Sequence, residues 1–153
     1  MATLKEGDKA PAFTAKDQNG KEVSLAEFKG KTVILYFYPK DDTPGCTAEA
    51  CDFRDNYQSL LAKGFEVIGV STDDEKSHKK FVTKHNLPFT LIADDSQEIV
   101  NAYGVWAEKS MYGKTYMGTV RTTFIIDGEG TISHIIKKVD TKASSQQVLD
   151  LLA

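Results

Sequence analysis

Residues 33–71 read VILYFYPKDDTPGCTAEACDFRDNYQSLLAKGFEVIGVS, and this stretch decides the fold. Its two ends, residues 33–38 and 65–71, are apolar almost throughout, as is typical of strands that are buried on both faces. Residues 43–63 carry apolar side chains at helical spacing, and Gly64 ends that pattern. A strand, a helix and a strand in this order predict two parallel neighbouring strands joined by a right-handed crossover.

The segments on either side extend this unit into an α/β protein. Before it, the sequence predicts a hairpin over residues 13–24. After it, in chain order, the sequence predicts a helix over 72–85, a strand over 89–93, a short helix over 98–103, a loop over 104–120, a hairpin over 123–136 and a last helix from residue 144. Capping boxes of Thr72 with Glu75 and of Ser144 with Gln147 mark the starts of the first and the last of these helices. We therefore expect one domain over residues 1–153 with a thioredoxin-like α/β fold. This fold is a mostly parallel central sheet with an antiparallel edge and helices on both faces, here with an extra N-terminal hairpin.

The composition is that of an ordinary globular protein, with 41% hydrophobic and 27% charged residues. The net charge of −3 gives no electrostatic support for binding to nucleic acid or to an anionic membrane. The longest apolar run, residues 33–38, is far shorter than the ~20 residues that span a bilayer. Residues 1–9 are polar and lack the pattern of a secretory signal. We expect a cytoplasmic protein without a nucleic-acid or membrane partner.

The two cysteines, Cys46 and Cys51, are the candidates for chemistry. In a reducing cytosol, a cysteine pair is more often catalytic, redox-sensing or metal-binding than structural. No set of histidines, cysteines and carboxylates has the spacing of metal ligands, so the sequence predicts no zinc site.

Cys46 is predicted to lie in the first turn of a helix. Thr43 suits the N-cap position, and Pro44 suits the first helical position, where its missing N–H costs nothing. Cys46 then falls at the third helical position. A thiolate there faces unpaired backbone N–H groups and the positive end of the helix dipole, which both favour the charged, reactive form.

Cys51 follows five residues later, and the spacing restricts what the pair can do. On an intact helix the two Cα atoms would be about 8.6 Å apart, whereas a disulfide requires at most about 7 Å. The cysteines are therefore either two unrelated thiols or a redox couple whose closure unwinds the first turns of the helix. The C-x₄-C spacing also argues against a C-x-x-C disulfide reductase.

The segment PKDDTPGC, residues 39–46, resembles the P-x-x-x-(T/S)-x-x-C active-site signature of peroxiredoxins. Together with Cys51 and with Arg121 ahead of the apolar segment TTFIID, it is similar to the bacterioferritin comigratory protein subfamily. The resemblance covers essentially the whole chain. It implies a thiol peroxidase of thioredoxin-like fold that uses no metal or organic cofactor, is monomeric or weakly dimeric, and is reduced by thioredoxin.

The resemblance also implies roles for the two cysteines. Cys46 would be the peroxidatic cysteine, whose thiolate attacks hydrogen peroxide or an organic hydroperoxide and becomes a sulfenic acid. Cys51 would be the resolving cysteine, which condenses with that sulfenic acid to an intramolecular disulfide after local unwinding. Thioredoxin or a similar dithiol would then reduce the disulfide.

Four further residues receive roles in the same way. Thr43 would orient the peroxide, and the backbone N–H groups of Gly45 and Cys46 would bind the reacting oxygens. Arg121 would supply permanently charged donors to the thiolate and the departing oxygen. Pro39 would shield the thiolate from water.

Other interpretations remain open. An alternative interpretation of Cys51 is a thiol that takes no part in the chemistry. An alternative function of the whole protein is that of a redox-sensing module that binds a partner when Cys46 is oxidised. His78 and His85, seven residues apart on the expected second helix, are interpreted as packed or partly exposed side chains. Arg54 is interpreted as a solvated or ion-paired helix residue.

Overall fold

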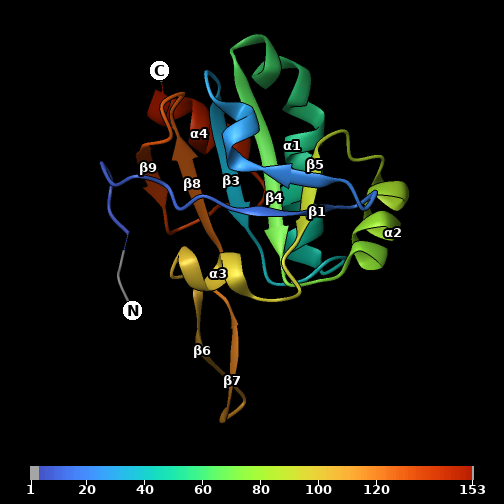
Figure 1. The fold of residues 1–153 in the computed structure, drawn as a ribbon. Helices are drawn as coiled ribbons and strands as arrows, with labels where there is room; N and C mark the ends of the chain where they lie inside the picture. Colours follow the sequence, from blue (N-terminus) through green and yellow to red (C-terminus); the bar gives the residue numbers. More distant parts are fainter. Residues whose placement is uncertain (1–3, 153) are drawn as a thin grey trace.

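Three parallel strands form the centre of a seven-stranded sheet in the computed structural model, which describes residues 4–152 (Figure 1). Antiparallel pairs flank this centre on both sides. The order in the sheet is β2-β1-β5-β4-β3-β8-β9. The strands are β1 (Thr14–Asp17), β2 (Glu22–Ser24), β3 (Thr32–Phe37), β4 (Phe65–Ser71), β5 (Thr90–Ala93), β8 (Thr122–Ile126) and β9 (Ile132–Ile136).

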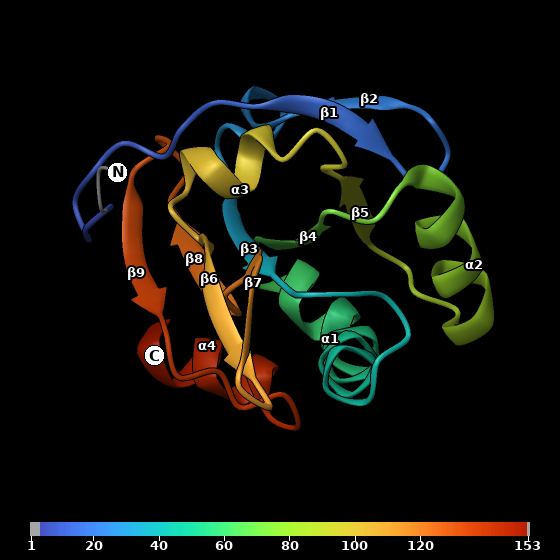
Figure 2. The ribbon, with the colours of Figure 1, turned by 90° about the horizontal axis from the view of Figure 1, so that it is seen from below.

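Helices cover both faces of the sheet, as Figure 2 shows from below. The helices are α1 (Pro44–Ala62), α2 (Glu75–His85), α3 (Glu98–Ala102), α4 (Ser144–Leu152) and the 3₁₀ helix η1 (Leu25–Phe28). Alternate side chains of β3 enter two separate cores. Ile34 and Tyr36 pack with α1, α2 and α4, whereas Leu35 and Phe37 pack with α3 and the N-terminal segment. This two-sided burial explains why β3 is apolar throughout.

The thioredoxin-like α/β fold expected from the sequence is confirmed, with one addition. The N-terminal hairpin is not a separate appendage, because β1 pairs antiparallel with β5 through Lys16 and Asp17. The sheet therefore has antiparallel strands at both edges rather than at one. Among residues 4–152, no helix combines the length and apolar character that crossing a membrane requires.

The loop predicted over residues 104–120 is wrong, because these residues form a second, two-stranded sheet. Strand β6 (Trp106–Met111) pairs with β7 (Lys114–Thr119), and the hairpin extends away from the main sheet (Figure 1). Tyr112 and Gly113 make the turn, both with positive φ, as a two-residue hairpin turn of type I′ requires. Most of the hairpin is exposed on both faces, so its sequence carries no clear apolar alternation.

Two predicted helix starts are also wrong in detail. Helix α2 begins at Glu75 after the N-cap Asp74, whose carboxylate accepts a hydrogen bond from the Ser77 N–H at 2.8 Å. Thr72 is not the cap, because the aspartate two residues later takes that position. In α4, Gln147 binds the Asp140 N–H instead of joining Ser144 in a capping box. Both helices are present, but Asp74 and Asp140 of the preceding loops take part in the hydrogen bonds near their starts.

Candidate active site

Cys46 lies where β3 passes into α1, and the local sequence explains its position. Thr43 is the extended N-cap residue and Pro44 the first helical residue, as predicted from the sequence. Cys46 thus lies in the first turn and points inward, with a relative exposure of 1%. It packs in the same core cluster as Tyr36 and Phe53. The thiol is held in a place that water barely reaches.

Arg121 reaches Cys46 because of the register of the sheet. The strand β8 runs antiparallel to β3, with Thr122 opposite Phe37. Arg121, the residue before β8, therefore lies beside the end of β3 from which the chain leads through a loop into α1. The Nη2 of Arg121 donates to the Sγ of Cys46 at 3.1 Å. A Cβ added to Gly45 would lie 3.3 Å from that nitrogen, so the absence of a side chain at Gly45 leaves room for the guanidinium group.

Glu49 is a member of this site that the sequence analysis missed. Its carboxylate is fully buried and accepts from the Arg121 Nη1 at 2.8 Å and from the Ser144 hydroxyl at 3.1 Å. Burial raises the pKa of Glu49, although the charge and hydrogen bond of Arg121 act in the opposite direction. One signal was available: Glu49 follows Cys46 by three residues and is the charged member of a stripe that includes Ala50 and Phe53.

Arg121 therefore lies between two acidic partners. Burial lowers the pKa of Arg121, but the charges and hydrogen bonds of Cys46 and Glu49 outweigh that effect and place it above its ordinary value. The guanidinium group remains charged. Because Glu49 fixes one of its nitrogens, the other points at the sulfur, which supplies a preoriented positive charge to a thiolate.

Thr43 and Pro39 lie in the loop before α1. The Thr43 hydroxyl donates to the Lys40 carbonyl oxygen at 2.9 Å and does not cap the helix with its side chain. Pro39 is half-buried at the start of the loop. The structure thus brings Gly45, Cys46 and Arg121 into direct contact, whereas no hydrogen bond among the described residues joins Thr43 or Pro39 to the sulfur.

Lys109 of β6 is a second cation near the thiol, and it falls in the segment wrongly predicted as a loop. Burial lowers the pKa of Lys109, the charge of Arg121 lowers it further, and Cys46 acts in the opposite direction. Gly118 of β7, which pairs with Ala107, lies diagonally across from Lys109, and a Cβ there would be 3.2 Å from the Cδ of Lys109. The hairpin therefore contributes to the electrostatics of the site.

Cys51 occupies a different environment on the same helix. It is half-buried, and its Sγ lies 4.0 Å from the Nδ1 of His85, the last residue of α2. Both cysteines are free thiols on an unbroken α1. The structure therefore does not bring Cys51 into contact with Cys46, as the helical spacing predicts.

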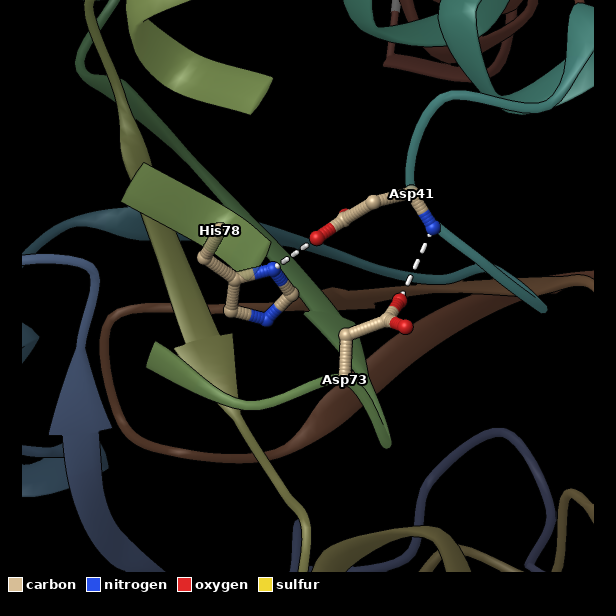
Figure 3. Close-up of side chains that lie close together, drawn as sticks. All are labelled: Asp41, Asp73 and His78. Atoms are coloured by element: carbon tan, nitrogen blue, oxygen red, sulfur yellow. Dashed lines mark hydrogen bonds and ion pairs between the residues drawn. The ribbon is translucent and has the colours of Figure 1, made fainter. Parts of the chain in front are cut away.

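The loop is fastened to α2 by a buried polar network, which Figure 3 shows. The Nδ1 of His78 lies 2.7 Å from Asp41, and the Asp41 N–H donates to Asp73 at 2.8 Å. The Nε2 of His78 lies 2.8 Å from the Ile92 carbonyl. Because both ring nitrogens face acceptors, His78 is an imidazolium paired with the Asp41 carboxylate. Burial lowers the pKa of His78, but the hydrogen bond and charge of Asp41 outweigh it, so the pKa is raised.

Asp41, Asp73 and His78 each offer a ligand atom within 4.8 Å of the others, a grouping that could hold a metal ion. Their hydrogen bonds favour another role. Asp41 also accepts from the Tyr38 hydroxyl at 2.6 Å and the Ser77 hydroxyl at 2.8 Å. The network is satisfied by the protein's own groups, and we interpret it as a clamp on the loop that leads to Cys46.

The thioredoxin-like architecture, and a buried cysteine bonded to an arginine in the first turn of a helix, are typical of thiol-based redox enzymes. Residues 6–135 match the AhpC/TSA family, and the chain belongs to this family. The chain is accordingly a peroxiredoxin, a thiol-dependent peroxidase.

The similarity to individual peroxiredoxins extends over nearly the whole chain. Peroxiredoxin Bcp of Bacillus subtilis (strain 168) is 47% identical over 150 residues, which are 98% of this chain and 96% of that protein. Peroxiredoxin Bcp of Escherichia coli (strain K12) is 44% identical over 152 residues, which are 99% and 97% of the two chains. The solved structure of a cysteine-to-serine variant of PrxQ from Xylella fastidiosa aligns with a TM-score of 0.93 at 28% identity, covering 99% of this chain and 97% of that one.

Proposed function

We propose that Cys46 is the peroxidatic cysteine and that Arg121 is its principal electrostatic partner. The observation that carries this proposal is the 3.1 Å hydrogen bond from the Arg121 guanidinium group to a sulfur that is almost completely buried in the first turn of α1. A fixed cation and the helix N-terminus both stabilise a thiolate. They also stabilise the negative charge that develops on the departing oxygen.

The first step transfers one oxygen atom. The Cys46 thiolate attacks one oxygen of ROOH, an S–O bond forms, and the O–O bond breaks. The departing RO⁻ takes up a proton and leaves as an alcohol, or as water when R is hydrogen, and Cys46 is left as a sulfenic acid. Thr43 orients the peroxide, the N–H groups of Gly45 and Cys46 bind its oxygens, and Pro39 limits the access of water.

In the second step Cys51 resolves the sulfenic acid as a disulfide. Because Cys46 and Cys51 are five residues apart on an intact α1, the first turns of the helix must unwind before the sulfurs meet. This unwinding also brings the Cys46 sulfur, which is buried in the intact helix, within reach of a reductant. Thioredoxin or a similar dithiol then reduces the disulfide and restores both thiols.

The proposed substrates are hydrogen peroxide and organic hydroperoxides. In support, a structural relative at TM-score 0.86 and 34% identity, the bacterioferritin comigratory protein of Xanthomonas campestris, is described by its alkyl peroxide reduction activity. We further propose that the protein acts as a monomer in the cytoplasm, where dithiol reductants are maintained.

The test is the intact mass of the reduced protein after one equivalent of hydrogen peroxide, measured without reductant. We expect a monomer lighter by two hydrogen atoms, and we expect thioredoxin to restore the original mass. A monomer that gains one oxygen would keep Cys46 as the reactive thiol but remove Cys51 from the cycle. An unchanged mass would contradict the peroxidatic role of Cys46.

A redox-sensing role is the second candidate, because the unwinding of α1 would also expose a surface for a partner. Turnover separates the two. A sensor is oxidised once, whereas a peroxidase consumes peroxide for as long as thioredoxin is supplied.

A further inference from the structure

Cys51 faces a histidine that is itself next to a carboxylate. The Nδ1 of His85 lies 4.0 Å from the Cys51 Sγ, and its Nε2 lies 3.5 Å from the Oδ1 of Asp42. We propose that His85 is the base that removes the proton of the Cys51 thiol when the disulfide forms, and that Asp42 sets the tautomer of His85. The proposal rests on the proposed resolving role of Cys51.

The orientation of the ring supports this assignment. Nε2 is buried and has no hydrogen-bond partner among the described residues except this approach to Asp42. The negative charge of Asp42, 3.5 Å from Nε2, favours a proton on that nitrogen, and Nδ1, 4.0 Å from the sulfur, is then left with a lone pair on the side of the thiol. A nucleophile, a base and a carboxylate that orients the base are the arrangement by which weak nucleophiles are activated.

The carboxylate is ionised and positioned for this task. The hydrogen bond from Lys84 is the main reason that the pKa of Asp42 is lowered. The Lys84 Nζ donates to both oxygens of Asp42, at 2.8 Å to Oδ2 and 3.1 Å to Oδ1, and the Oδ1 side also faces the Nε2 of His85. Asp42 adopts positive φ, an uncommon conformation for a residue other than glycine, and its side chain contacts Lys84 and His85 at the end of α2.

The charged groups around His85 come from three segments. The loop contributes Asp42, α2 contributes Lys84, and α1 contributes Cys51 and Arg54. The Arg54 guanidinium group donates to the His85 carbonyl oxygen at 2.9 Å and to Asp55 at 2.9 Å, so it holds the backbone of His85 and is itself paired. The ring of Phe81 packs edge-on against the imidazole of His85, with 5.2 Å between the ring centroids, and limits the rotation of the imidazole.

Cys51 keeps this position while Cys46 moves. The part of α1 that begins at Asp52 is fastened on two sides, because the Ser145 N–H donates to the Asp52 carboxylate at 2.7 Å and Arg54 holds α2. Unwinding of the residues before Cys51 therefore leaves its sulfur beside His85. The peroxidatic sulfur travels to a resolving thiol that is already next to its base.

The chemistry balances without a further reactant. Nδ1 of His85 takes the thiol proton, and the Cys51 sulfur forms a bond to the sulfenic sulfur of Cys46. The S–O bond breaks, and the departing hydroxide takes a proton from the imidazolium and leaves as water. The Cys46 sulfur is reduced and the Cys51 sulfur is oxidised, each to the disulfide level. Asp42 pairs with the imidazolium while it exists.

The test separates the two steps in His85→Gln, with His134→Gln in β9 as the matched control. Protein is mixed with one equivalent of hydrogen peroxide and quenched at intervals, and the sulfenic acid and the disulfide are counted by mass. In His85→Gln we expect an unchanged rate of sulfenic acid formation, which also reports that the site is folded. We expect disulfide formation to be slower by about 10²-fold at pH 7, and the deficit should shrink as the pH rises and hydroxide replaces the base.

The control should match the wild-type protein in both steps. Asp42→Asn should slow disulfide formation without changing the first step, because the ring is no longer held in one tautomer. Disulfide formation at the wild-type rate in His85→Gln from pH 6 to 9 would overturn the role of His85. If the wild-type protein itself forms no disulfide between Cys46 and Cys51, the resolving role has failed, and that outcome is visible before any variant is made.

Discussion

Cys46 and Cys51 lie on one helix within five residues of each other, yet their surroundings differ in every respect that controls thiol chemistry. Cys46 is 1% exposed and bonded to Arg121, whose charge does not change with pH. Cys51 is half-buried and faces the imidazole of His85, whose Nδ1 lies 4.0 Å from the sulfur. The proposed peroxidatic thiol thus lies beside a permanent cation, whereas the proposed resolving thiol lies beside a side chain that can act as a base.

The helix itself is divided in the same way. In its first turns, Cys46 is bonded to Arg121, and Glu49 is bonded to Arg121 and to Ser144 of α4. From Asp52 onward, α1 is held by α2 and α4. In the proposed cycle, oxidation of a Cys46 thiolate removes the negative charge beside Arg121, and this weakens the contact of Arg121 with Cys46 but not the contacts of Asp52 and Arg54. The two halves of α1 are expected to respond differently to peroxide.

The largest effect is expected from exchanging the cysteines for serine one at a time. Cys46→Ser should abolish peroxide consumption, because a hydroxyl group is not ionised at neutral pH. Cys51→Ser should still be oxidised once, should accumulate a sulfenic acid that dimedone traps, and should overoxidise with excess peroxide. Intact mass before and after peroxide measures both results. Continuous peroxide turnover with thioredoxin in Cys46→Ser, or turnover at the wild-type rate in Cys51→Ser, would contradict the assignment of the two thiols.

Arg121→Ala should have the next largest effect. Loss of the guanidinium group removes the donor to the thiolate and the departing oxygen, and we expect sulfenic acid formation to slow by about 10²–10³-fold. Arg54→Ala is the matched control, because Arg54 is the other arginine of the chain and lies on the Cys51 side. Intact mass of samples quenched at intervals after mixing with peroxide measures the rate of oxidation in both variants. An equal loss in both variants would show that the effect is not specific to the contact with Cys46.

The features that the sequence predicts correctly depend on strong local patterns. Residues 33–71 combine two buried strands with a helix whose start is marked by Thr43 and Pro44, and both the fold and the location of Cys46 in the first helical turn follow from them. The β6–β7 hairpin was missed because exposure on both faces removes the alternation on which strand prediction depends.

The partners of the cysteines were harder to predict for a different reason. The contacts of Asp41 with His78 and of Asp42 with His85 join residues 37 and 43 positions apart, and no local spacing reveals such pairs. The seven-residue separation of the two histidines places both on one face of α2, but only the fold shows that this face meets the loop. Glu49 was accessible in principle, since a buried helical stripe with one carboxylate requires a partner.

His78→Gln tests whether the loop that leads to Cys46 is held to α2 by the buried ion pair of Asp41 and His78. Removing one partner of such a pair is expected to cost about 3–5 kcal/mol of unfolding free energy. The folded-state pKa of His78 is raised, so its contribution is complete below the unfolded pKa of about 6.5 and is lost as the pH rises through the folded-state value. Urea denaturation from pH 5.5 to 9 should show the difference from wild type shrinking with pH. A difference that is constant or grows would contradict the ion pair, and His134→Gln controls for the substitution.

The smallest effect, and the one that tests the division of α1 most directly, is a change in amide exchange on oxidation. The Cα atoms of Cys46 and Cys51 would be about 8.6 Å apart on a helix, beyond the ~7 Å reach of a disulfide. Residues 47–51 should therefore exchange faster in the disulfide form, whereas residues 53–62, fastened to α2 and α4, should keep their protection. Equal protection of residues 47–51 in both forms would exclude unwinding. Faster exchange along all of α1 would show that the anchors at Asp52 and Arg54 do not hold Cys51 beside His85.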